Sequence, residues 1–570
     1  MRILLLTHSF NSLTQRIFAE LAARGHELSV ELDINDAVTR EAVALFQPDL
    51  VIAPFLKRAI PEAVWRNRLC LIVHPGIRGD RGPSALDWAI LEGRSSWGVT
   101  VLQADAEMDA GPVWACAEFA MRSATKSSLY RNEITEAAVR AVLDALGRIE
   151  QGTGPLPAAS ETGAHRLACW RGPCRQSDRA IDWRSDDTLT VLAKIASADG
   201  TPGVRDIALG REVYLHDAHP APGLSGAPGA ILATSGPAIA RATIDGAIWI
   251  GQLRDPASTY PFKLPATTVL KGAFGAIPEI DRDTDQGYRE ITYEETRGVG
   301  YLHFRFYNGA MGTDACTRLR AAYVQAVKRP TRVIVLMGAP DFWSNGMDLN
   351  AIEAAESPAD ESWRNINAID DLSEAIIRTE SHLTVAALQG NAGAGGVFLA
   401  RAADEVWTRE GVILSPHYKD MGNLYGSEFW TYLLPRHAGA ENAQRIMAAR
   451  LPMGSSEAVT LGLADARFGA CPADFLEEVR TRAQALASAP DWAAQLAAKK
   501  RERVADEDKK PLAAYRSEEL ERMRLNFYGF DPSYHVARYN FVRHVPKSRT
   551  PITIARHRDR RLAPYWRNAS

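Results

Sequence analysis

Cysteine is scarce and scattered in this sequence, with six residues in a chain of 570. No two of them form a Cys-x-x-Cys pair, and no His or Cys cluster has the spacing of metal ligands. Isolated thiols are typical of proteins that stay in a reducing compartment. The sequence therefore predicts no disulfide framework, no metal site and a cytoplasmic location.

Long apolar runs and a large excess of one charge are also missing. No apolar run reaches the roughly 20 residues that cross a membrane, and the opening MRILLLTHSF lacks the length and flanks of a signal peptide. The formal net charge of −3 argues against a protein that coats a polyanion. We expect small-molecule substrates, with neither a membrane nor a nucleic acid as partner.

What the sequence does contain is enough apolar material, 46% of its residues, for the cores of several α/β domains. Residues 1–160 alternate short apolar strands with amphipathic helices, which predicts a doubly wound, Rossmann-like sheet. The stretch QGTGPLPAASETGA indicates a linker. Residues 165–275 change to short strands and turns, which predicts a small β domain. The strands expected in the first region are RILLLTH, DLVIAPF, CLIVHPG and GVTVLQAD.

The second half of the chain repeats the α/β texture after a further loose stretch. Residues 276–289 are expected to be a linker, and residues 290–490 a second α/β domain. Residues 491–570 are charged and helical, and they close with a basic tail that we expect to be mostly a solvated surface. The fold class expected is therefore α/β and multidomain.

The stretch CLIVHPGIRGDRGPSALDWAI carries the first candidate site. An apolar strand stops at His74, a glycine-rich loop follows, and a helix begins. Open α/β sheets bind ligands at the carboxyl ends of their strands. Asp109 follows a neighbouring strand, and a histidine–carboxylate pair suits acyl transfer because the carboxylate orients the imidazole while it moves a proton. The alternative is that His74 packs against a turn and Asp109 caps one.

These motifs, with EMDAGPVWA after GVTVLQAD, resemble the signature of 10-formyltetrahydrofolate-dependent formyltransferases. DRAIDW, PGV and LPATTVLKG resemble the small β-barrel that follows the catalytic domain of methionyl-tRNA formyltransferase. The resemblance implies a folate-binding formyltransferase domain at the N-terminus, with 10-formyltetrahydrofolate as formyl donor and His74 and Asp109 as catalytic residues. It also implies that APFLKRAIP holds the pterin, which points to Phe55, Leu56 and Lys57.

One position departs from that family. The asparagine that precedes the histidine by two residues falls on Ile72. Such an oxyanion donor contributes about 3 kcal/mol to transition-state stabilisation. Its loss disfavours transfer to an amine, but leaves open transfer to a thiol, which ionises more easily.

Two glycine-containing turns form the second candidate site; they lie in DFWSNGMDLNAIE (341–353) and ALQGNAGAGGVFLARAADEVW (387–407). Backbone N–H groups of such turns can form an oxyanion hole for a thioester carbonyl; the alternative for a single glycine turn is close helix packing. Together with LPMGSSEAVTLGLAD they resemble the crotonase (enoyl-CoA hydratase/isomerase) superfamily. The resemblance implies a CoA-binding domain with Met347 and Gly395 as oxyanion donors, and we expect Ala394 to be tolerated in place of a glycine.

The two glutamates that serve as acid and base in a hydratase are replaced in this sequence. In this resemblance the two glutamates fall on Phe398 and Tyr418, so enoyl-CoA hydration is not expected. Tyr418 is either a hydrogen-bond donor and weak acid or an apolar wall with its hydroxyl satisfied. Glu428 is the nearest carboxylate, and Tyr425 is another phenol.

The order of the two halves, with these altered residues, resembles the HypX family of hydrogenase-maturation proteins. The resemblance implies that formyl is loaded onto CoA and lost as CO, which becomes a ligand of the [NiFe]-hydrogenase iron. The partners it implies are the hydrogenase large subunit or other maturation proteins. Cations for the CoA phosphates are needed, and the candidates for CoA binding are Gln15, Arg16, Arg131, Arg538 and Arg543.

Two other functions compete with this interpretation. One is a formyltransferase for an amine, on a tRNA or a sugar, fused to an unrelated acyl-CoA enzyme; Ile72 and the missing glutamates count against it. The other is a non-catalytic CoA-binding scaffold that docks hydrogenase precursors. The retained His74 and Asp109 count against this second alternative.

Overall fold

Two compact units make up the described part of the chain. The structure, a computed structural model, describes residues 1–157 and 170–559. One unit comprises residues 1–288 together with the end of the chain from residue 546, and the other comprises residues 289–545. Half of the predicted linker QGTGPLPAASETGA and the tail arginines beyond residue 559 lie outside the described residues.

The N-terminal domain is built on a six-stranded sheet in the order β2-β1-β3-β4-β5-β6. The strands β1 to β4 are mutually parallel where they pair, and β5 runs antiparallel to both of its neighbours. The four predicted strands are confirmed. The strand bounds are β1 (Arg2–Thr7), β2 (Glu27–Leu32), β3 (Leu50–Phe55), β4 (Leu69–His74), β5 (Ser96–Gln103) and β6 (Val113–Ala120).

Helices cover this sheet because its central strands are apolar on both sides. All of Ile3–Leu6 in β1 are buried, as parallel strands between helical layers must be. Helix α1 begins where the Asn11 side chain accepts a hydrogen bond from the Thr14 N–H, and it ends before Gly25 as expected. The helices are α1 (Ser12–Ala23), α2 (Asp36–Phe46), α3 (Glu62–Trp65), α4 (Ala85–Leu91), α5 (Lys126–Leu129), the π turn η1 (Tyr130–Ile134) and α6 (Thr135–Glu150).

The small β domain that was expected after the first domain is an antiparallel sheet in the order β7-β8-β11-β10-β9, with β12 paired to β11. Its apolar residues alternate inward, and Val213, Leu215, Ile239, Ile248 and Ile250 form its core. Its elements are the 3₁₀ turn η3 (Gln176–Arg179), α7 (Thr188–Ala196), β7 (Val204–Ala208), β8 (Arg211–Pro220), β9 (Ile231–Ser235), β10 (Ala238–Ala242), β11 (Ala247–Arg254), β12 (Lys263–Pro265) and α8 (Ala266–Val269).

The second unit contains two sheets. The larger has the order β13-β14-β15-β17-β19-β22, and the smaller has the order β16-β18-β20-β21. Their strands are β13 (Ile291–Thr296), β14 (Val299–Phe304), β15 (Val333–Met337), β16 (Phe342–Ser344), β17 (Leu383–Leu388), β18 (Asn391–Gly393), β19 (Glu405–Arg409), β20 (Ile413–Ser415), β21 (Met453–Gly454) and β22 (Ala466–Phe468).

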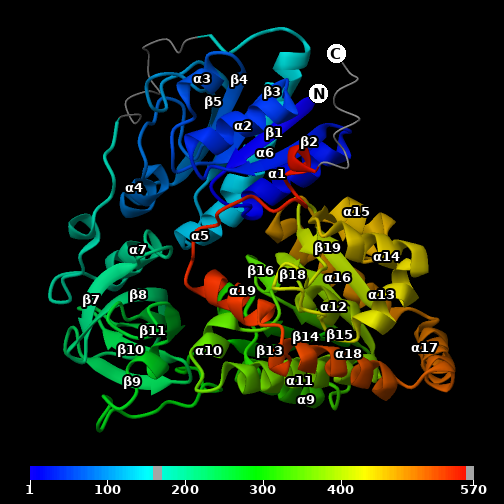
Figure 1. Ribbon diagram of the computed structural model, residues 1–570. Helices are drawn as coiled ribbons and strands as arrows, with labels where there is room; N and C mark the ends of the chain where they lie inside the picture. The colour runs from blue at the N-terminus through cyan, green and yellow to red at the C-terminus, as the bar shows by residue number, and fades with distance from the viewer. Residues whose placement is uncertain (158–169, 560–570) are drawn as a thin grey trace. The chain divides into compact units, whose positions relative to one another are not determined.

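The helices of this unit pack on two apolar cores: α16 and α17 pack on one beside the larger sheet, and most of the others surround a second core, to which both sheets contribute (Figure 1). They are η4 (Tyr307–Gly309), α9 (Thr313–Ala326), α10 (Leu349–Glu353), α11 (Pro358–Ile377), α12 (Gly395–Arg401), α13 (Trp430–Ala438), α14 (Ala440–Ala449), α15 (Ser455–Thr460), α16 (Pro472–Ser488), α17 (Trp492–Lys509), α18 (Leu512–Tyr528) and α19 (Ser533–Val542).

Two segments differ from the expected domain organisation. The segment 276–289, expected to be a linker, forms hydrogen bonds with the β domain: the Ile280 N–H donates to the Thr234 carbonyl, and the Tyr288 hydroxyl donates to Asp217. The region 491–570 is not one extension. Its helices contribute Met523, among others, to the core of the second unit, and its end packs in the first unit.

That end of the chain lies along the outer strand β2, where the red end of the ribbon is seen in Figure 1. The Val30 N–H donates to the Ile554 carbonyl, and the Leu32 N–H donates to the Thr550 hydroxyl. His557, in the turn η5 (Arg556–Arg558), is buried against Glu31. The described part of the basic tail is therefore structural.

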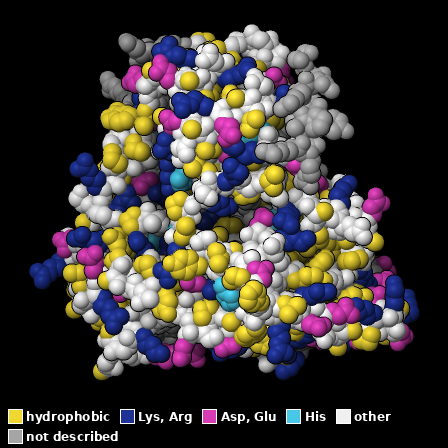
Figure 2. All heavy atoms as spheres, viewed as in Figure 1, with side chains coloured by type: hydrophobic (Ala, Val, Ile, Leu, Met, Phe, Trp, Pro, Cys, Tyr) yellow, Lys and Arg dark blue, Asp and Glu magenta, His cyan; other side chains and the backbone are white. Residues whose placement is uncertain are grey.

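The surface agrees with a nearly neutral protein. On the face shown in Figure 2, Lys and Arg are interspersed with Asp and Glu. None of the helices within the described residues is long and apolar enough to cross a membrane.

Candidate active sites

His74 ends strand β4 and is almost fully buried. The loop that follows is held to β5, because the Trp97 indole donates to the Pro75 carbonyl at 2.9 Å and the Thr100 hydroxyl donates to the Gly76 carbonyl at 2.9 Å. Gly76 is required here: a Cβ at that position would lie 2.4 Å from the His74 Nε2 atom. The strand and its loop therefore fix the imidazole in one place.

Both ring nitrogens of His74 face carboxylates. The Nδ1 atom lies 3.6 Å from Asp109 Oδ2, as the sequence leads us to expect, and the Nε2 atom lies 3.1 Å from Asp80 Oδ2. Asp80 is fully buried, and its second oxygen has no hydrogen-bond partner. A neutral imidazole donates at only one nitrogen, so it can give a hydrogen bond to only one of these two carboxylates at a time.

Asp109 reaches His74 by a route that the sequence does not indicate. Strand β5 is antiparallel to β4, and its end at Gln103 lies opposite Leu71 rather than His74. The following loop returns Asp109 to the histidine, where the Gly82 N–H donates to Asp109 Oδ2 at 3.1 Å. Asp109 has φ 53°, in the left-handed region that costs energy for a residue with a Cβ.

The expected pterin-binding segment lies beside His74. In the parallel pairing of β3 with β4, Ala53 is opposite Ile72. Phe55 ends β3 and His74 ends β4, so both lie at the same edge of the sheet. The Phe55 carbonyl accepts from the His8 N–H at 2.7 Å, and Leu56 packs on the core. Lys57 is exposed at this edge.

In the second unit, three parallel strands of the smaller sheet deliver the second site. Met347 follows β16, Gly395 follows β18, and Tyr418 follows β20. A Cβ on Gly346 would lie 3.5 Å from the Gly395 nitrogen, so the two expected oxyanion turns lie against each other. Gly395 is the first residue of α12, and its N–H therefore has no acceptor within the helix.

Ala394 is not a neutral replacement for glycine. It adopts φ 46° and ψ −127° immediately before α12. An alanine in this region carries strain on the order of 1–3 kcal/mol. The turn therefore accommodates the alanine with backbone strain next to Gly395.

Tyr418 and Glu428 form a buried pair at this site. The Tyr418 hydroxyl donates to Glu428 Oε2 at 2.7 Å and lies 3.0 Å from the Ser427 carbonyl. The other oxygen of Glu428, Oε1, would lie only 2.0 Å from a Cβ on Gly395. The carboxylate thus lies between the phenol and the Gly395 turn.

Burial governs the protonation of this pair. It raises the pKa of Glu428 to about 8, and the charge of Asp370 adds to the effect although the Tyr418 hydrogen bond opposes it. Burial, with Glu428 beside it, raises the pKa of Tyr418 far above its ordinary value. Phe398 stacks on the Tyr418 ring with centroids 5.6 Å apart. Tyr425, the other phenol considered, is partly exposed.

The expected CoA-binding residues fall into different surroundings. In the first unit, Gln15 donates to the Phe10 carbonyl, and Arg16 is held by Glu20 and Glu136. Arg131, in η1, is close enough to Lys263 for its charge to act on it. Burial lowers the pKa of Lys263 to about 8, Asp199 opposes that change, and Arg131 adds to it. Two neighbouring cations favour a bound anion.

In the second unit, Arg538 is buried and pairs with Glu353 at 2.9 Å. Arg543 lies 3.7 Å from the same carboxylate and over the Tyr539 ring. The guanidinium of Arg538, like that of Arg16, is therefore engaged within the protein. Among the described residues no group of three His, Cys, Asp or Glu side chains is placed to hold a metal ion.

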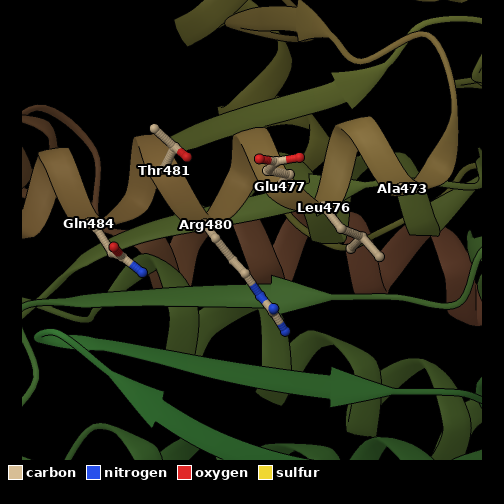
Figure 3. A pocket seen from close by; sticks show the side chains of 6 residues that line it. All are labelled: Ala473, Leu476, Glu477, Arg480, Thr481 and Gln484. Carbon is tan, nitrogen blue, oxygen red and sulfur yellow. The ribbon is translucent and has the colours of Figure 1, made fainter.

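A hollow of about 310 Å³ lined by residues of α16 contains none of the candidate site residues (Figure 3). Its lining residues are Ala473, Leu476, Glu477, Arg480, Thr481 and Gln484.

Comparison with known proteins agrees with this architecture. The formyl transferase family matches residues 19–146, the formyl transferase C-terminal domain matches 173–261, and the enoyl-CoA hydratase/isomerase family matches 302–523. The hydrogenase maturation factor HoxX of Bradyrhizobium diazoefficiens is 60% identical over 98% of this chain and 98% of its own. The chain belongs to the HypX/HoxX family of hydrogenase maturation factors.

Solved structures of the HypX/HoxX family share its fold. A crystal structure of HypX from Aquifex aeolicus in complex with tetrahydrofolic acid matches with a TM-score of 0.94 and 50% identity, over 98% of this chain and 99% of that chain. Methionyl-tRNA formyltransferase of Dechloromonas aromatica is 25% identical over 44% of this chain and 78% of its own length. The expected resemblances to HypX, the formyltransferases and the crotonase superfamily are confirmed.

Three buried carboxylates of this family member were missed in the sequence. Asp80 stands in the loop IRGDRG, where its spacing of six residues from His74 was an available signal. Asp370 and Glu519 lie on the helices α11 and α18, far along the chain from Glu428. No local pattern marks them, because charged positions on amphipathic helices are usually exposed.

Proposed function

We propose that the protein transfers the formyl group of 10-formyltetrahydrofolate to the thiol of CoA and then releases that group as CO. The observation that carries the proposal is the buried Tyr418–Glu428 pair beside Gly395, in a crotonase-like site where Phe398 stands at a hydratase's first glutamate. This site can move a proton, but it has no second carboxylate where a hydratase needs one to activate water.

His74 supports the first step. The sulfur of CoA bonds to the formyl carbon, the bond from that carbon to the folate nitrogen breaks, and the thiol proton ends on that nitrogen. An imidazole between Asp109 and Asp80 is held to carry that proton. Ile72 leaves the site without the usual amide donor, which suits a thiol nucleophile better than an amine.

Tyr418 and Glu428 support the second step. The ionised Glu428 takes the proton from the formyl carbon, the carbon–sulfur bond breaks, and Tyr418 gives its proton to the departing sulfur. Glu428 then returns the proton to Tyr418 across their 2.7 Å hydrogen bond. The net change is formyl thioester to CO and thiol, with atoms and charge balanced. The N–H groups of Met347 and Gly395 hold the carbonyl oxygen.

Several residues are proposed to bind the substrates. Phe55, Leu56 and Lys57 hold the pterin of the folate, at the sheet edge where His74 ends its strand. In the first unit, Gln15 and Arg131, supported by the neighbouring Lys263, are proposed to hold the anionic part of CoA, with Arg16 beside them in its ion pairs. In the second unit, Arg543 and the ion-paired Arg538 are proposed to contribute to CoA binding.

The proposed product fits the family's role in hydrogenase maturation. We propose that the CO is destined for the iron of a [NiFe]-hydrogenase, with the hydrogenase large subunit or another maturation protein as its receiver, in the cytoplasm. The iron is then cargo of the receiver rather than a group held by this chain.

The test separates the two steps. The purified protein is given 10-formyltetrahydrofolate and CoA, with deoxyhaemoglobin as reporter for CO and mass spectrometry for formyl-CoA. We expect CO in amounts equal to the folate consumed, and His74→Ala to stop folate consumption while added formyl-CoA still yields CO. Folate consumption without CO, or an equal rate in His74→Ala, would overturn the proposal.

A further inference from the structure

Glu428 lies in a turn that two other buried carboxylates hold. Asp370 comes from α11 and Glu519 from α18, and each of the three side chains is at most 1% exposed. Fully buried carboxylates are rare unless they are hydrogen-bonded, paired with a cation or part of a functional site. The contacts of Asp370 and Glu519 show which donors they satisfy.

Asp370 binds the residues on either side of the Ser427–Glu428 peptide. Its Oδ1 atom accepts from the Glu428 N–H at 2.8 Å, and its Oδ2 atom accepts from the Ser427 hydroxyl at 2.8 Å. Neither bond involves the Glu428 side chain. Asp370 therefore fixes the backbone from which that side chain projects.

Glu519 binds the next part of the same turn. Its Oε2 atom accepts from the Phe429 N–H at 2.9 Å, and its Oε1 atom accepts from the Thr431 N–H at 2.8 Å and from the Thr431 hydroxyl at 2.5 Å. These are N–H groups at the start of α13, which have no acceptor within the helix. Glu519 thus caps α13 from another helix.

The turn needs such support because its backbone is strained. Glu428 has φ 58° and Phe429 has φ 61°, two successive residues with side chains in the left-handed region. Each such residue costs on the order of 1–3 kcal/mol and persists only where its surroundings hold it. Strain of this kind is typical of functional sites.

We propose that Asp370 and Glu519 are positioning residues for CO release: they hold the strained turn so that Glu428 lies between Tyr418 and Gly395, and their nearby charge strengthens Glu428 as a base. This inference rests on the proposed role of Glu428 as the group that takes the formyl proton. A formyl C–H is a very weak acid, so a carboxylate of ordinary strength would be a poor acceptor.

The charges around Glu428 act in one direction. Burial raises the pKa of Asp370 to about 7 and that of Glu519 to about 8, and each of these carboxylates also raises the pKa of Glu428. The other titratable groups facing the cluster are the Cys316 thiol of α9 and the phenols of Tyr418 and Tyr425.

The cation Arg516 offsets only part of the charge of the cluster. Arg516 of α18 acts on Asp370, but its guanidinium pairs with Asp371 at 2.6 Å and with Glu374 at 2.9 Å. Removing one carboxylate from the cluster should therefore lower the pKa of Glu428.

The test is the pH dependence of CO release from added formyl-CoA in the full chain, after subtraction of the reaction without enzyme. In the wild type the rate should rise with pH through a midpoint near 8, since Glu428 must be ionised. In Asp370→Asn and Glu519→Gln more of the carboxylate is ionised at low pH, but it is a weaker base. We expect these variants to be roughly two- to threefold faster than wild type at pH 6.5 and about threefold slower at pH 9.

Such crossing profiles distinguish positioning from simple damage, which would lower the rate at every pH. The matched control is the residue before Glu519 on α18, Glu518→Gln, whose side chain is 63% exposed. Its midpoint should stay within a few tenths of a pH unit of wild type. Unmoved midpoints in both cluster variants would overturn the inference.

An infrared titration keeps this inference separate from the proposed function. The C=O stretch of protonated Glu428, assigned by its loss in Glu428→Gln, is followed against pH with no substrate present. It should disappear near pH 8 in wild type and at lower pH in Asp370→Asn. If the wild type makes no CO, the proposed function fails, and this titration alone decides whether the two carboxylates strengthen Glu428.

Discussion

A histidine that moves a proton between reactants needs partners that fix the orientation of its ring and the role of each ring nitrogen. At His74, both nitrogens have a carboxylate as partner. Asp109 lies at Nδ1 and Asp80 at Nε2. The sequence shows the first carboxylate through its motif. No motif marks the second carboxylate, Asp80. It reaches the ring only in the folded loop, where Gly76 leaves space that a side chain would fill.

Asp80→Asn should slow formyl transfer to CoA by roughly tenfold or more, because the amide cannot balance a protonated imidazole. The rate of 10-formyltetrahydrofolate consumption measures this, with CO release from formyl-CoA as the internal reference. The control is Glu107→Gln, which removes an exposed carboxylate that pairs with Arg81. Equal rates in the two variants would leave Asp80 without a part in the transfer.

Tyr418→Phe should slow CO release by about 10²–10⁴-fold and let formyl-CoA accumulate, since the ring stays stacked on Phe398 while the proton donor is lost. Formyl-CoA and CO are followed over time, with folate consumption in parallel. Should CO form at the wild-type rate, Tyr418 is an apolar wall and Glu428 must act without it.

At the scale of elements, the sequence predicts the strands that carry the sites. It does not predict the direction in which each strand pairs or where the following loop leads. The apolar runs ending at His74 and preceding Gly395 give β4 and the β17–β18 segment. The antiparallel direction of β5 was not evident, because an apolar run has no direction. It changes how Asp109 reaches its partner.

The polar strand β2 shows a second limit. ELSVEL carries Ser29 and Glu31 at positions that the fold buries. Their partners are His557 and Thr550, more than 500 residues later. No window of sequence around β2 contains that information, so the strand was not singled out.

The turn before α12 provides a prediction at this scale. Gly395→Ala would place a Cβ 2.0 Å from Glu428 Oε1 and should displace the carboxylate, with loss of CO release and little change in folate consumption. Gly312→Ala, where the nearest atom would be at 3.5 Å, is the matched control. An active Gly395→Ala protein would show that Glu428 does not act from its present place.

At the scale of the whole molecule, the end of the chain is part of its first unit. Glu31 Oε2 accepts from His557 at 2.9 Å and from Arg558 at 2.7 Å. Burial would raise the pKa of Glu31, but His557, Thr550 and Arg558 outweigh it and hold the pKa below its ordinary value. The edge of the sheet is thereby covered.

Glu31→Gln should destabilise this unit by about 1–3 kcal/mol, because it removes a buried carboxylate bound to Thr550, His557 and Arg558, although Arg558 keeps its pair with Glu41. We expect the melting temperature to fall by roughly 2–10 °C in calorimetry. The lowered pKa makes the stabilisation present above about pH 4.5 and lost as the pH falls further, so the two proteins should converge in acid. Glu27→Gln on the same strand is the control; a similar loss there would contradict the assignment.

The central claim is that one carbon passes from folate to CoA and leaves as CO. The direct measurement supplies 10-formyltetrahydrofolate labelled with ¹³C in the formyl group, together with unlabelled CoA, and follows the label by mass spectrometry and infrared spectroscopy. The account predicts ¹³C in formyl-CoA in the Tyr418→Phe protein and in haemoglobin-bound CO in the wild type. Label that ends in formate, with no ¹³CO, would contradict it.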